Sequence, residues 1–151
     1  MTILGAHGIE IDVLEGWEGR IFRRGVIARG EHAQPVVHLA NFSLPHERGD
    51  FGSGVVEGMR GRDVFVVLFE YGRESVGKPL FAHHGMPQLT PRNFSSQRLQ
   101  RHLRGQAGCQ MFFTQGRRPF CLYVVVQDGR LRASLVAETN EALARVKVVG
   151  K

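Results

Sequence analysis

Cysteine, lysine and long apolar runs are all scarce in this chain. Its two cysteines among 151 residues are not spaced as CxxC, which argues against a zinc site. No apolar run approaches the roughly 18–20 residues that cross a bilayer. The first residues also lack the basic and apolar regions of a secretory signal. We therefore expect a cytoplasmic protein that does not insert into membranes.

Only three of the 20 basic residues are lysine, while 17 are arginine, and the formal net charge is +6. Arginine suits phosphate and carboxylate partners because its planar guanidinium donates hydrogen bonds in pairs. The arginines are nevertheless spread along the whole chain, which is typical of solvated surfaces. An anionic partner is the alternative interpretation.

The chain does have the composition of an ordinary globular domain. Hydrophobic residues make up 42% of it and charged residues 23%. A chain of this length can bury roughly 68–70% of its unfolded surface. Since no linker, repeat or low-complexity segment divides the sequence, we expect a single domain over residues 1–151.

Alternating apolar and polar residues predict six strands. They lie near residues 7–14, 18–24, 35–42, 63–71, 108–114 and 119–127. The strands at 63–71 and 119–127 are apolar on both faces. Both faces must then be covered, so these two strands should be central. The first strand carries Glu10 and Asp12 on its second face and should be peripheral.

The segment 111–124 is a predicted β-hairpin. With its turn centred on Gly116-Arg117, Cys109 opposes Val124 and points to the opposite face from Cys121. A register slip of one residue would reverse this arrangement. Both cysteines are interpreted as small buried apolar residues, and no disulfide is expected between them.

A helix is predicted over residues 134–146, where apolar residues recur on one face and good helix formers follow. The alternative is a return strand over residues 131–135, because Asp128-Gly129 is also a hairpin signal. Thr90-Pro91 predicts a second, short helix that includes Phe94.

The order of these elements resembles the Mog1/PsbP-like group, which includes the DcrB- and DUF1795-type bacterial proteins. The resemblance is carried by residues 9–17, which end in Gly16-Trp17, and by the apolar strand 120–126 before the terminal helix. It covers the whole chain. The proline that usually precedes the Gly-Trp pair is replaced here by Glu15.

This resemblance implies an α+β fold, in which flanking helices cover a mostly antiparallel central sheet as an α/β/α sandwich. It also implies that Trp17 fills the core. Members of the group act as a partner of a small GTPase, as an assembly factor of a photosynthetic complex and as chaperones for secreted effectors. The resemblance therefore implies a non-catalytic binding module, and no residue-level role transfers because the group shares no active-site motif.

No arrangement of residues predicts catalysis, and neither a cofactor nor a metal ion is expected. Gly52-Ser53-Gly54 matches neither a nucleophile elbow nor a phosphate-binding loop. His83 and His84 are adjacent, so their side chains would diverge in a regular strand. Glu70 could act as a base with a raised pKa, but solvation or pairing with an arginine is the preferred interpretation. No ligand spacing links the other histidines, which are His7, His32, His38, His46 and His102. A small enzyme with an unrecognised site is one alternative function.

Nucleic-acid binding is the other alternative. Arg117 and Arg118 lie at the predicted hairpin tip beside aromatic residues, and Phe112, Phe113 and Tyr123 could form a stacking platform. The signature of RNA-binding sheets is absent. Most of these aromatic residues also belong to strands that should be central.

The preferred function is protein binding, as an adaptor, a chaperone or a subunit of a larger assembly. The partner would be another protein or a second copy of the chain. Residues 49–61, which enter a strand near Val55-Val56, and residues 72–85 form long connections that are commonly functional. Their apolar residues could contact a partner or could cap the core. The candidate partner-binding residues are Phe51, Met59, Leu80, Phe81, Met86, Arg117 and Arg118.

Overall fold

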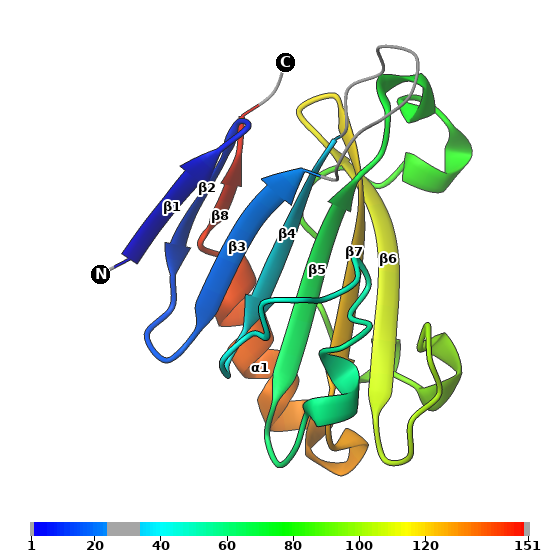
Figure 1. Cartoon of the computed structure of the whole chain (residues 1–151). Coiled ribbons are helices and arrows are strands. Elements are labelled where there is room, and N and C mark those ends of the chain that lie inside the picture. Colours follow the sequence, from blue (N-terminus) through cyan, green and yellow to red (C-terminus); the bar gives the residue numbers. More distant parts are fainter. Residues whose placement is uncertain (1, 24–33, 150–151) are drawn as a thin grey trace.

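A computed structural model describes residues 2–23 and 34–149, which form two antiparallel sheets and an α-helix (Figure 1). The three-stranded sheet has the order β1-β2-β8, and the five-stranded sheet has the order β3-β4-β5-β7-β6. The strands are β1 Thr2–Ala6, β2 Ile9–Val13, β3 Glu18–Arg23, β4 Pro35–Ala40, β5 Val64–Glu70, β6 Ala107–Gln115, β7 Arg118–Val126 and β8 Val146–Val148. The helix α1 spans Arg132–Leu143. The prediction of a mixed fold with mostly antiparallel pairing is confirmed.

All six predicted strands are present as β2 to β7, whereas β1 and β8 were not predicted. Residue 24, the end of one predicted strand, lies outside the described residues, as does His32. The predicted helix is confirmed as α1 and the return strand is excluded. Its end was wrong, because Val146 and Val148 alternate with Lys147 and pair with β2 as β8. The small sheet thus has β2 as its middle strand.

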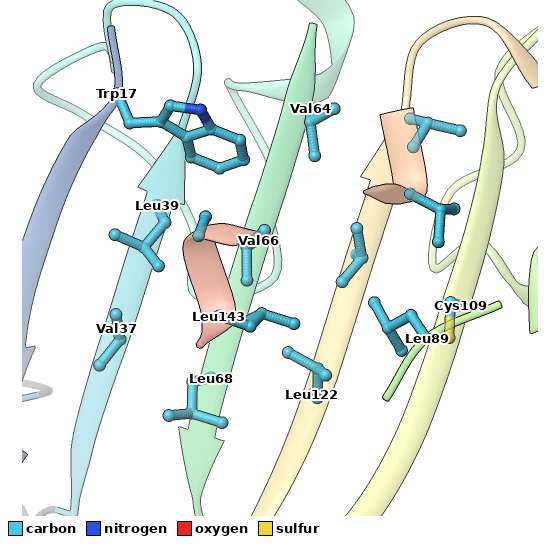
Figure 2. Packing of buried hydrophobic residues seen from close by; sticks show 14 of the residues in the cluster. Trp17, Val37, Leu39, Val64, Val66, Leu68, Leu89, Cys109, Leu122 and Leu143 are labelled. Carbon is cyan, nitrogen blue, oxygen red and sulfur yellow. The ribbon is translucent and has the colours of Figure 1, made fainter. Parts of the chain in front are cut away.

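The two strands that are apolar on both faces occupy internal positions in the large sheet, as predicted. Val64, Val66 and Leu68 of β5 point to one face, here called the first face, which α1 covers. Figure 2 shows Leu143 of α1 over Val66 and Leu68. Phe65 and Val67 point to the second face. Burial on both sides makes β5 and β7 the centre of the molecule.

The second face is covered by connections rather than by a helix. Val55, Val56 and Met59 pack there against Phe65 and Val67. The strand predicted near Val55-Val56 was wrong, because a 3-10 turn, Val56–Gly58, follows a glycine-rich bend. Within the described residues, α1 is the only α-helix, so the expected layer of helices on both faces is not observed.

Gly52 makes this bend possible. Its φ of +99° favours glycine, and a Cβ at this position would lie 2.8 Å from Cε2 of Phe65. The chain can therefore turn directly over the aromatic ring and place Val55 and Val56 on the second face. Gly52-Ser53-Gly54 lies in this turn, and Ser53 is exposed.

Trp17 is buried between β3 and α1, as the resemblance implied. Its side chain is 8% exposed and packs in the first-face core. The indole N–H donates a hydrogen bond of 3.1 Å to Glu138 Oε1 of α1. A buried indole needs such an acceptor. Trp17 therefore joins the β2–β3 connection to the helix. Figure 2 shows its indole ring at the same end of the core as Leu39 and Val64.

The register of the β6–β7 hairpin is the predicted one. Cys109 lies opposite Val124, and Cys121 lies opposite Phe112. Both thiols are free and buried, and burial raises the pKa of each to about 11. Because side chains alternate along each strand, the two sulfur atoms point to opposite faces of the sheet.

Candidate functional site

Of the predicted partner-binding residues, only some are at the surface. Leu80 is 58% exposed, and Phe51 and Met86 are half-buried. Met59 and Phe81 are buried, so for these two candidates the alternative interpretation, that they cap the core, is confirmed. Met59 fills the second-face core, and the ring of Phe81 packs against other aromatic rings.

The two arginines at the hairpin tip, Arg117 and Arg118, also differ in exposure. Arg117 is exposed, but Arg118 is 1% exposed and forms two hydrogen bonds with Glu70, at 2.6 and 3.0 Å. Its guanidinium also donates to the carbonyl oxygens of His7 and Val149. The expected basic tip with two free arginines was therefore wrong. Arg118 instead ties β7 to β5 and to the small sheet.

This ion pair shows which of the two interpretations of Glu70, a catalytic base or a partner of an arginine, applies. The carboxylate is 4% exposed and accepts hydrogen bonds from Nε and Nη2 of Arg118. It is thus paired with an arginine, as preferred, but it is not solvated. Both oxygens of the carboxylate are occupied by the buried pair with Arg118, so Glu70 is not a candidate base.

The remaining polar candidates do not assemble into a site. His83 and His84 are exposed. Among residues 2–23 and 34–149, no group of three histidine, cysteine, aspartate or glutamate side chains could hold a metal ion.

His38 is a buried polar residue whose role was not predicted. Its Nδ1 accepts a hydrogen bond of 2.8 Å from Arg48 Nε, and its Nε2 lies 2.7 Å from the carbonyl oxygen of Asp50. Since Nδ1 accepts, Nε2 must carry the proton and donate it. Burial, followed by the charge of Arg48, lowers the pKa of His38 to about 4. The sequence signal that could have indicated this buried role is a single histidine within the otherwise apolar strand β4.

Among the residues that the structure describes, the outer side of β6 is bridged at two places. Near its start, Ser95 and Gly108 exchange two N–H···O hydrogen bonds of 2.9 Å. Near its end, the Thr114 N–H donates to His83 O at 2.8 Å and the Gly85 N–H donates to Thr114 O at 2.9 Å. Figure 1 shows β6 as the last strand of the sheet.

Between these bridges, β6 presents unpaired backbone groups. Gly108 and Thr114 direct their N–H and C=O groups away from β7. In an antiparallel ladder without a bulge, Gln110 and Phe112 must do the same. In the part of the chain that the structure describes, no backbone group bonds to these two residues. We call the outer side of β6 from Cys109 to Phe113 the open edge.

Two side chains at the open edge, Met111 and Phe112, are apolar and half-buried. Phe112 lies on the second face, where its ring centroid is 5.7 Å from that of Phe81 and 6.3 Å from that of Tyr71. Met111 lies on the other face, half-buried against the first-face core. The sequence of β6, AGCQMFFTQ, contains no charge and no proline. Charged residues and proline are what usually protect an edge strand from pairing with another chain, and β6 has neither.

An aromatic row continues from Phe112 across the second face. The ring of Phe69 contacts Tyr71 at 5.3 Å and stacks on Phe51 at 5.0 Å. A hollow of about 260 Å³ lies at the Phe51 end and is lined also by Tyr123 and Arg101. Phe51, which the sequence proposed as a contact, therefore lies in the same row as the open edge.

No family model, curated protein or solved structure matches this chain. Within the described residues, no helix has both the length and the apolar character needed to cross a membrane.

Proposed function

We propose that this chain is a non-catalytic protein-binding module whose open edge pairs with an extended segment of a partner protein. The observation that carries the proposal is the unpaired backbone of Gln110 and Phe112 on an uncharged edge strand. In this kind of recognition, main-chain hydrogen bonds provide affinity and alternate side chains provide specificity. A role as adaptor, chaperone or complex subunit in the cytoplasm, within the Mog1/PsbP-like group, belongs to the same proposal.

The bridges define the partner segment. Ser95 occupies the position beside Gly108, and His84 occupies the position beside Thr114. A partner strand is thus restricted to about five residues next to the open edge. Its side chains would alternate between Phe112 on the second face and Met111 on the first. We therefore propose an extended segment with apolar residues at alternate positions.

The same bridges argue against pairing of two copies through the full length of β6. In an antiparallel pair of β6 strands, the second strand would have to occupy the places of Ser95 and His84. The partner proposed here is accordingly a different protein. Nucleic-acid binding at the hairpin tip is less well supported, because Arg118 is buried against Glu70.

Gln110→Pro tests the proposal. The Gln110 N–H faces away from β7, so proline removes an outward donor without removing a hydrogen bond of the β6–β7 ladder. A displayed library of random eight-residue peptides is selected on the wild-type protein. We expect the selected peptides to lose about tenfold or more in affinity for Gln110→Pro. Gln110→Thr, which keeps the N–H and suits a strand, is the matched control and should bind as the wild type does.

Hydrogen exchange provides a second measurement. The amides of Gln110 and Phe112 should exchange rapidly in the free protein and slowly in the peptide complex, because pairing with the peptide would protect them. Peptides that bind Gln110→Pro and wild type equally, with no protection of these amides, would contradict binding at the open edge.

A further inference from the structure

A second surface, with lining residues different from those of the open edge, concentrates positive charge. A groove of about 640 Å³ lies where the connection before β6 meets the start of α1. Arg104, Arg130 and Arg132 line it, together with Ser96. The one carboxylate in its wall, Asp128, is already paired with Arg130 at 3.1 Å. We call this surface the arginine groove.

The guanidinium of Arg132 is held in place before any ligand arrives. Its Nε donates to Gly129 O at 2.6 Å and its Nη1 donates to Phe94 O at 2.8 Å. The carbonyl oxygens fix the plane of the guanidinium, so little side-chain entropy would be lost on binding an anion. Arg132 is half-buried, which reduces the screening of its charge by water.

Arg104 is different, because it is exposed and has no hydrogen-bond or ion-pair partner among the described residues. It comes from the connection before β6, whereas Arg130 and Arg132 come from the segment after β7. Gly105 and Gly129 also line the groove, and the Gly129 N–H donates to Gly105 O at 2.9 Å. Since these positions carry no side chain, a ligand can approach the backbone closely.

From these observations we infer that the arginine groove binds a small molecule that carries two linked phosphate groups. Three guanidiniums face one carboxylate, which leaves an excess of positive charge that a polyanion would neutralise. Guanidinium groups match phosphate oxygens in pairs of hydrogen bonds. The volume of the groove lies within the range of small-molecule sites and exceeds what a single phosphate would fill.

Calorimetric titration with inorganic pyrophosphate tests the inference on the full chain. At 50 mM salt (about three times below physiological ionic strength) we expect a Kd below about 100 μM for pyrophosphate. Binding of single phosphate should be about tenfold weaker. Arg104→Gln should weaken pyrophosphate binding by about tenfold, and it leaves the fold intact because this side chain is exposed. Arg132→Lys, which keeps the charge but loses the planar fork, should also weaken it.

Arg23→Gln is the matched control, because it removes the same charge from the end of β3 that lies at the opposite end of the large sheet from the groove, and it should leave binding unchanged. Gln110→Pro should also bind pyrophosphate normally, so this test is independent of the open edge. Equal binding by wild type and Arg104→Gln, or no binding at 1 mM pyrophosphate (about tenfold above the expected Kd), would overturn the inference. A ten-nucleotide single-stranded RNA that binds more tightly than pyrophosphate and also requires Arg104 would identify nucleic acid as the ligand and would overturn it as well.

Discussion

The two edges of the large sheet are built from contrasting residues. Three of the six residues of β3 are charged, namely Glu18, Arg20 and Arg23, and Arg20 pairs with Glu18 at 3.5 Å. None of the nine residues of β6 is charged. Charged side chains on an edge disfavour pairing with another chain, and their absence favours it. The contrast indicates that β3 is a protected edge and β6 an available one.

The largest expected effect is on stability, and it comes from the Arg118–Glu70 ion pair that anchors the β6–β7 hairpin. Arg118→Met should lower the free energy of unfolding by roughly 3–5 kcal/mol, because it leaves the Glu70 carboxylate buried and unpaired. Urea unfolding measures this loss. Arg117→Met, at the neighbouring exposed position, should change stability by less than about 0.5 kcal/mol. Similar losses for the two variants would mean that the ion pair does not anchor the hairpin.

The second-largest expected effect is a pH dependence of stability. It comes from His38 of β4, the strand next to the protected edge strand β3. The pKa of His38 is about 4 in the folded protein and 6.5 in the unfolded chain. Its contribution to stability is therefore complete above pH 6.5 and is lost as the pH falls towards 4, by about 3 kcal/mol in total. Urea unfolding at several pH values measures this slope.

Histidine at an exposed position provides the comparison for this pH dependence. His46→Gln should keep the pH dependence of the wild type, since His46 is exposed. His38→Gln should be less stable at pH 7 but should lose less stability between pH 6.5 and 4. An unchanged slope in His38→Gln would show that another group causes the acid sensitivity.

A smaller effect is expected at the tip of the hairpin. Arg117 has a φ of +65°, a left-handed conformation that costs a residue with a side chain about 1 kcal/mol. Arg117→Gly should therefore raise the free energy of unfolding by up to about 1 kcal/mol. Arg117→Ala keeps the Cβ and should give no such gain. A loss of stability in Arg117→Gly would mean that the arginine side chain makes a favourable contact at the tip.

The smallest effect on stability is expected when a charge is added to β6 or removed from β3. Gln110→Lys places a charge on the available edge and should change stability by less than about 0.5 kcal/mol, while it reduces peptide binding and aggregation. The reverse change, Arg20→Val, should increase aggregation by removing a charge from β3. Light scattering at raised temperature compares the variants. Equal aggregation of all three proteins would remove the distinction between the two edges.

Much of the large sheet could be predicted because its signals are local. The two-sided apolar pattern of β5 and β7 gives their central position, and the turn at Gly116-Arg117 gives the register of the hairpin. The strands β1 and β8 were missed since each is short and is stabilised by pairing with β2. Their pairing depends on residues far away in the sequence.

The candidate site was harder to predict, because burial and edge position depend on strand order. Arg118 is adjacent to the exposed Arg117 in the sequence, but its partner Glu70 is 48 residues away. Phe81 is buried by rings from two different strands. That β6 is an edge strand also follows only from the order of all five strands. Phe51, in contrast, could be proposed as a contact from its position in a long glycine-bearing connection, and its ring stacks on Phe69 in the aromatic row.

The pairing of β2 with β8 has a consequence for the order of folding. Ile9 pairs with Val148, so the small sheet joins segments near the two ends of the chain. Contacts with such a large sequence separation form slowly, because a long loop must close first. During synthesis, the hairpin of β1 and β2 can form early, but the pairing of β2 with β8 must wait until β8 has left the ribosome. The guanidinium of Arg118, which binds the carbonyl groups of both His7 and Val149, completes its contacts only at that final step.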